Sequence, residues 1–101
     1  MQVTLTLSDG LTSDQGRIKV AEIGEAPFRV GRAPDCDLVL VDPGATVSRL
    51  HLELRVSGGE LLVVSHGGGG TSVDSAGARL QTGMPARLPD QCRLLLPAGT
   101  I

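Results

Sequence analysis

Two arginines and one serine are the side chains in this sequence best suited to bind an anion. Arg32 follows Gly31, and Arg49 follows Ser48 directly in a later segment. A guanidinium group can donate two parallel hydrogen bonds to an oxyanion, and a serine hydroxyl can donate another. This combination suits a phosphate group, which carries about −1.5 to −2 charges at neutral pH. The alternative is that both arginines are surface residues in weak ion pairs.

Four consecutive glycines at residues 67–70 follow His66 and also suggest chemistry. The oxyanion loop of lipases has a similar order, but the sequence lacks a G-x-S-x-G nucleophile motif, and no Gly-Lys-Ser/Thr marks a P-loop. Ser48 and His51 are unsuited as nucleophile and base, because residues three apart in an alternating strand point to opposite faces. We therefore expect a glycine-rich turn, no catalytic residues and a protein that is not an enzyme.

The charge balance argues against nucleic acid as a partner. The sequence has 9 Lys+Arg and 11 Asp+Glu, a formal net charge of −2, and Phe28 is its only aromatic residue. Nucleic-acid-binding domains usually need a basic surface, and single-strand binders also stack bases on aromatic side chains. We therefore expect no nucleic-acid binding.

The two cysteines, Cys36 and Cys92, lie far apart in the sequence and belong to no C-x-x-C or Cys/His ligand pattern. We expect free, buried thiols, with neither a metal nor another cofactor. The longest apolar runs, residues 38–41 and 61–64, are much shorter than the roughly 20 residues that span a bilayer. We expect a cytoplasmic protein without membrane insertion.

Short β-strands are the elements that must position the candidate residues. Apolar and polar residues alternate in residues 2–8 and 49–56, which is typical of strands with one buried face. In the second segment the apolar side chains occupy even positions, and the polar ones, His51 among them, occupy odd positions. Gly58 and Gly59 separate this segment from residues 61–64 and predict a hairpin.

The remaining apolar runs are also short and lie between turn-forming residues, at 17–23, 28–30, 38–41, 78–80 and 93–96. Several short strands with turns between them predict an all-β sandwich or barrel. A length of 101 residues suits one domain, and we expect residues 1–101 to form it.

The order and spacing of three segments resemble the forkhead-associated (FHA) domain family. They read Phe28-Arg29-Val30-Gly31-Arg32, Asp37-Leu38-Val39-Leu40 and Ser48-Arg49-Leu50-His51. The resemblance covers about residues 22–96. It implies a β-sandwich of about eleven strands, with a phosphothreonine-peptide site in the loops at one end.

The resemblance also implies roles for single residues. Three of them, Arg32, Ser48 and Arg49, would contact the phosphate. Further contacts to the phosphopeptide would come from the glycine loop and the segment after it, at Gly68, Gly69, Thr71 and Asp74. The residues that would hold these loops in place are Gly31, His51 and Gly70.

The glycine loop departs from the family pattern of Ser-x-Asn-Gly-Thr. Gly69 stands where the family has an asparagine that anchors the peptide backbone, and losing one such hydrogen bond costs about 0.5–1.5 kcal/mol. Two functions therefore remain open. One is a phosphothreonine-dependent signalling module that docks a kinase-modified partner protein. The other is a degenerate FHA domain in a phosphate-independent assembly, such as a bacterial secretion system.

The resemblance also indicates how the sequence ends. Residues 92–96 would form the penultimate strand, residues 97–99 its turn, and Thr100 would begin the last strand. This leaves open that the last strand continues beyond Ile101. An extension there is expected to raise thermal stability, because an unfinished strand leaves a neighbouring backbone edge unpaired.

Overall fold

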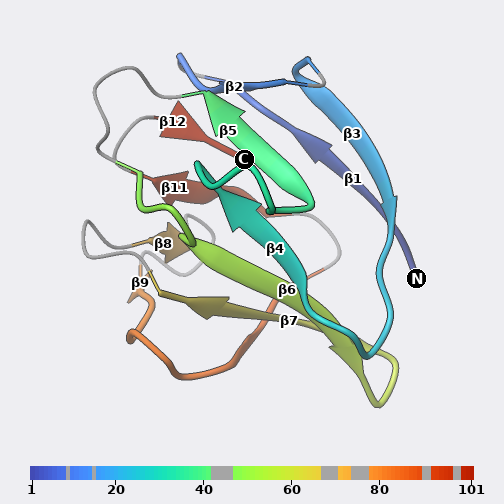
Figure 1. Ribbon diagram of the computed structural model, residues 1–101. Coiled ribbons are helices and arrows are strands. Elements are labelled where there is room, and N and C mark those ends of the chain that lie inside the picture. The colour runs from blue at the N-terminus through green and yellow to red at the C-terminus, as the bar shows by residue number, and fades with distance from the viewer. Residues whose placement is uncertain are drawn as a thin grey trace.

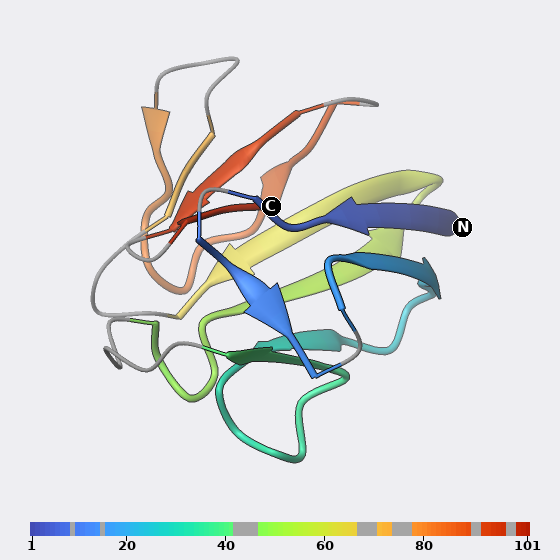
Figure 2. The same ribbon diagram turned by 90° about the horizontal axis from the view of Figure 1, so that it is seen from above.

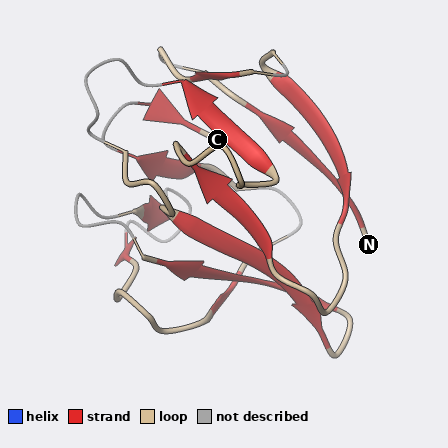
Figure 3. Cartoon of the chain, in the orientation of Figure 1, coloured by secondary structure: helices blue, strands red, loops and turns tan. Residues whose placement is uncertain are grey.

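The computed structural model describes residues 1–8, 10–14, 16–41, 47–66, 71–73, 78–89, 92–96 and 99–101. This part of the chain is all-β, with twelve strands and no helix (Figures 1 and 3). The strands are β1 Gln2–Thr6, β2 Thr12–Ser13, β3 Ile18–Glu22, β4 Phe28–Gly31, β5 Leu38–Val41, β6 Leu52–Ser57, β7 Glu60–Ser65, β8 Ser72–Val73, β9 Ala78–Arg79, β10 Ala86–Arg87, β11 Leu94–Leu96 and β12 Gly99–Thr100. The predicted all-β class is therefore confirmed.

The strands form three sheets. A six-stranded sheet has the order β10-β7-β6-β4-β5-β2, a four-stranded sheet has the order β12-β11-β8-β9, and β1 pairs with β3. Seen from above, β4 and β5 lie on one side of the molecule and β8, β9 and β11 on the other (Figure 2). All pairings are antiparallel except that of β4 with β5, which is parallel.

The core fills the space between these layers. The six-stranded sheet contributes Val30, Leu38 and Leu54, and the four-stranded sheet contributes Leu94 and Leu96. Inward and outward residues alternate at the start of β6. Leu52 and Leu54 are buried, and Glu53 between them is partly exposed. This is the β-sandwich that the alternation predicts.

The hairpin between β6 and β7 confirms the prediction from its paired glycines. Ser57 lies opposite Glu60, and the two residues between them, Gly58 and Gly59, have φ angles of 60° and 77°. Both angles are in the left-handed region, which a glycine adopts without steric cost. The register of the longest strand pair in the fold starts from this turn.

The predicted strand over residues 49–56 begins too early. The strand β6 starts at Leu52, and His51 before it is as fully buried as Leu52 itself, so the alternation stops there. Residues 49 and 50 bend instead of continuing the strand. Ser48 and His51 therefore do not lie in one alternating strand, which is the basis for placing their side chains on opposite faces. A bend instead brings the main-chain amide of Ser48 to the imidazole ring of His51.

The last two strands form a hairpin. Leu94 and Ile101 exchange both main-chain hydrogen bonds, at 2.8 and 2.9 Å. Cys36 is buried, as expected, whereas Cys92 is only partly buried, and both are free thiols. The described residues contain no helix, and therefore no helix that is long and apolar enough to span a membrane.

Candidate functional site

The end of β4 and the segment before β6 lie side by side and carry the candidate phosphate-binding residues. Three backbone hydrogen bonds join them, from the amide of His51 to the carbonyl of Val30 at 2.9 Å, from Arg32 to Ser48 at 3.2 Å and from Ala33 to Arg49 at 3.0 Å. Although Arg32 and Ser48 are distant in sequence, their main chains therefore touch. The structure brings Arg32, Ser48 and Arg49 to one end of the sheet.

Gly31 permits this close approach. A Cβ atom at this position would lie 2.1 Å from the carbonyl oxygen of Arg49 and 3.0 Å from the amide nitrogen of His51. Real Cβ contacts are essentially never that short, so a larger residue would have to push the two segments apart. Gly31 is thus needed for the space it leaves and not for a positive φ.

The side chain of Arg32 is anchored to the segment before β6. Its Nε donates a hydrogen bond to the main-chain carbonyl of Val47, a residue that is fully buried. Arg32 is half-buried, whereas the side chain of Arg49 is exposed. One guanidinium group is therefore fixed at the edge of the core, and the other extends toward solvent.

His51 connects the site to the core. Its side chain is 0% exposed, and its Nδ1 accepts a hydrogen bond from the amide of Ser48 at 3.1 Å. A neutral imidazole whose Nδ1 is an acceptor carries its proton on Nε2. That nitrogen lies 3.1 Å from Oγ1 of Thr71, to which it donates. The ring therefore joins the segment before β6 to the segment that follows the glycine run.

Thr71 occupies the interior side of this network. Only 1% of it is exposed, and its hydroxyl also accepts a hydrogen bond from Oγ of Ser65 at 3.1 Å. Its carbonyl accepts a bond from the amide of Leu80 at 2.8 Å. The family resemblance implies that Thr71 contacts the peptide, but its hydroxyl is directed at His51 and Ser65.

The other predicted residues of this loop region are Gly68, Gly69, Gly70 and Asp74, which lie outside the described residues. Sequence reasoning missed Val47 and Ser65, and it assigned Cys36 only as a buried thiol. Val47 takes part through its carbonyl oxygen, which leaves no signature in the side-chain pattern. Ser65 ends an apolar run, where nothing distinguishes it from a polar residue at a strand end.

The thiol of Cys36 also reaches this region. Its Sγ donates to the carbonyl oxygen of Arg49 at 3.3 Å, and its amide donates to the carbonyl of Ala33 at 3.0 Å. Burial raises the pKa of the Cys36 thiol, and the nearby carboxylate of Asp35 raises it further. The thiol therefore stays protonated near neutral pH and remains a donor.

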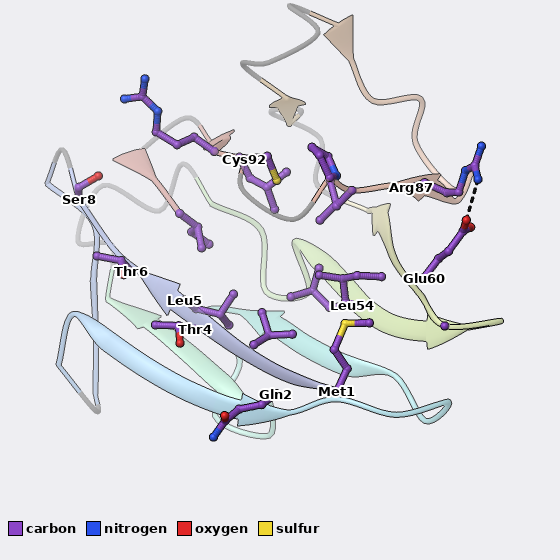
Figure 4. Close-up of a pocket in the computed structure, with 18 residues that line it drawn as sticks. Met1, Gln2, Thr4, Leu5, Thr6, Ser8, Leu54, Glu60, Arg87 and Cys92 are labelled. Atoms are coloured by element: carbon purple, nitrogen blue, oxygen red, sulfur yellow. Dashed lines mark hydrogen bonds and ion pairs between the residues drawn. The ribbon is translucent and has the colours of Figure 1, made fainter.

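A groove of about 1090 Å³ lies elsewhere in the molecule (Figure 4). Met1 and β1 form one wall, and Leu88, Cys92 and Ile101 are among the residues on other sides. An ion pair at 2.8 Å between Arg87 and Glu60 is drawn there as a dashed line (Figure 4). The lining includes none of the candidate phosphate-binding residues, so this groove is separate from the site described above.

Solved structures of FHA domains are similar to this chain over nearly its whole length. One, from a structural and functional analysis of phosphothreonine-dependent FHA domain interactions, is 30% identical, with a TM-score of 0.73 over 99% of this chain and 92% of that chain. The FHA domain of FhaA, complexed with the intracellular domain of Rv3910, is 31% identical, with a TM-score of 0.72 over 96% and 93% of the two chains.

A more distant likeness supports the fold alone. The N-terminal FHA domain of Rad53p from S. cerevisiae, in complex with a phosphothreonine peptide, is 16% identical, with a TM-score of 0.67 over 88% of this chain and 81% of that chain. No curated protein sequence matches the chain significantly. The FHA domain family matches residues 28–97, which include the whole of the candidate site described here. Because that match covers most of the chain and the chain folds as the same β-sandwich, this chain belongs to the FHA domain family.

Proposed function

We propose that this chain is a phosphothreonine-peptide-binding module that docks a partner protein modified by a Ser/Thr kinase and has no catalytic activity of its own. The observation that carries the proposal is the main-chain contact between the Arg32 and Ser48–Arg49 segments. It brings together, at one end of the sheet, the main chains that carry two guanidinium groups and a hydroxyl. A relative with 30% identity comes from a study of phosphothreonine-dependent FHA domain interactions, which supports the same function.

The two arginines have unequal tasks in this proposal. Arg32 is half-buried and bonded to Val47, so binding a phosphate costs it little side-chain entropy. Arg49 is exposed and therefore loses more freedom on binding, and its charge is better screened by solvent. We expect Arg32 to contribute more to affinity than Arg49.

Gly31, His51 and Thr71 support the site without touching the ligand. Gly31 leaves room for the Arg49 carbonyl, and His51 holds the Ser48 amide from inside the fold. Thr71 supports His51 in turn. This assigns Thr71 to the support of the loops rather than to the peptide contacts.

The partner would meet the module in the cytoplasm, because the free thiols of Cys36 and Cys92 suit a reducing compartment. Calorimetric titration tests the function, with a library of phosphothreonine peptides and the same peptides without phosphate. The proposal predicts binding only by phosphorylated members. Equal binding with and without phosphate would favour the phosphate-independent assembly role, and no binding to any phosphopeptide would contradict the proposal.

A further inference from the structure

The carbonyl oxygen of Arg49 accepts two hydrogen bonds from the loop after β4. The amide of Ala33 donates to it at 3.0 Å, and the thiol of Cys36 donates to it at 3.3 Å. The α-carbon of Gly31 packs against the same atom. The last residue of β4 and two residues of the loop after it therefore converge on the peptide unit between Arg49 and Leu50.

Cys36 is itself rigidly placed. It is 9% exposed, and the hydrogen bond from its amide to the carbonyl of Ala33 closes a tight turn. This turn fixes the thiol relative to Ala33, whose own amide is the second donor to the Arg49 carbonyl. Both donors to the Arg49 carbonyl therefore belong to the same turn.

Resting on the proposed function, we propose that Cys36 is a positioning residue of the phosphate site. With Ala33, it holds the Arg49 carbonyl and so fixes the main chain from which the Ser48 hydroxyl and the Arg49 guanidinium reach the phosphate. The Arg49 side chain is exposed. The direction in which this side chain leaves the backbone is therefore set by the main chain. If the Arg49 carbonyl could rotate freely, the guanidinium group would sample more conformations before binding and would lose more entropy on binding.

The raised pKa of Cys36 agrees with this role, because only the protonated thiol can donate. The competing explanation is that Cys36 merely fills space, as a small apolar residue would. The two explanations predict different effects of replacing Cys36 with serine. Serine keeps a donor at almost the same place, whereas alanine has none.

The test compares Cys36→Ala and Cys36→Ser with the unmodified chain, using one phosphothreonine peptide and calorimetry at a temperature where every variant is folded. We expect Cys36→Ala to weaken binding by about three- to tenfold and Cys36→Ser to restore it to within about twofold. The matched control is Cys92→Ala, which removes the other thiol. Cys92 packs against the core but lines the separate groove, so its loss should lower thermal stability without changing the peptide Kd.

NMR relaxation of the Leu50 amide, which shares a planar peptide unit with the Arg49 carbonyl, measures mobility at Arg49 and needs no ligand. The Cys36→Ala chain should show increased mobility at Arg49, and Cys36→Ser should not. If the unmodified chain bound no phosphopeptide, the proposed function would fail while this measurement still tested the positioning. Unchanged Arg49 mobility and Kd in Cys36→Ala, or a Cys36→Ser chain as impaired as Cys36→Ala, would overturn the proposal. Should Cys36→Ala not fold, increased Arg49 mobility in Cys36→Val, which fills the space without a donor, supports the proposal, and unchanged mobility overturns it.

Discussion

The α-carbon of Gly31 faces the carbonyl oxygen of Arg49 so closely that a methyl group on Gly31 would lie 2.1 Å from it. This contact joins the end of β4 to the segment before β6, and both segments carry candidate phosphate-binding residues. Three backbone hydrogen bonds flank it. The site is therefore assembled by a backbone contact that tolerates no side chain, and the nearby guanidinium groups depend on it.

Gly31→Ala is expected to destabilise the fold by about 2–4 kcal/mol, because a methyl group that collides with backbone forces the two segments apart. The free energy of unfolding in urea measures this. Gly24→Ala is the matched control, since a Cβ there would meet nothing within 4 Å, and it should change stability by no more than about 0.5 kcal/mol. Equal stability of the two variants would show that the contact is not tight.

Thr71→Val is expected to cost about 1–3 kcal/mol of stability. Valine has nearly the shape of threonine but lacks the hydroxyl that accepts from His51 and Ser65, so two buried donors would lose their partner. Thermal denaturation measures the loss, and Thr71→Ser, which keeps a hydroxyl, should recover most of it. A Thr71→Val chain that kept full stability but lost peptide binding would instead place Thr71 in direct contact with the ligand.

His51→Ala should lower the melting temperature and weaken peptide binding together, because the Ser48 amide and the Thr71 hydroxyl both lose a buried partner. The expected cost is about 1–3 kcal/mol. His66→Ala is the control, since the side chain of that histidine is 34% exposed and its Nε2 lies 3.1 Å from a carboxylate oxygen of Glu53. It should change stability by less than about 1 kcal/mol. Loss of binding at unchanged stability in His51→Ala would argue against its role as a brace.

A longer last strand is expected to raise thermal stability by pairing with the edge of β1 that lines the groove. Met1 and Leu7 bond to Ile23 and Arg17 on the β3 side, so the alternate residues Gln2, Thr4 and Thr6 direct their main-chain groups to the other edge. Those residues and Ile101 all line the groove. A designed Val-Thr-Val-Thr extension after Ile101 should pair with this edge and raise the melting temperature by roughly 4–8 °C, the shift that about 1 kcal/mol produces in a domain of this size.

A Gly-Ser-Gly-Ser extension of the same length is the control for that design, because it adds residues with little tendency to form a strand. It should leave the melting temperature unchanged. If both extensions had the same effect, the β1 edge would not accept a strand.

Much of the sandwich could be predicted from the sequence because alternating residues and glycine turns act locally. The alternation predicted β1 and β6, an apolar run between turn-forming residues predicted β3, and the glycine pair predicted the hairpin after β6. The two-residue strands β2 and β10 could not be predicted, because so few residues carry no periodic pattern. The sandwich holds them in place through pairing with longer strands, which is tertiary information.

The bend before β6 escaped prediction for a different reason. Leu50 continues the even-numbered apolar pattern of Leu52 and Leu54, so the sequence there looks like a strand. At the bend, the Arg49 carbonyl accepts hydrogen bonds from the amide of Ala33 and the thiol of Cys36, both in the loop after β4. Such bonds to a carbonyl depend on the path of the whole chain and cannot be read from one segment.

Binding of one phosphothreonine peptide to the unmodified chain and to Arg32→Ala tests the central claim most directly. Removing this guanidinium should cost about 1.5–3 kcal/mol, which is more than a tenfold rise in Kd, with little change in melting temperature. Arg17→Ala, which removes the same charge from an exposed position outside the candidate loops, should leave Kd nearly unchanged. Equal affinities of the unmodified and Arg32→Ala chains for the peptide would contradict a phosphate site at Arg32.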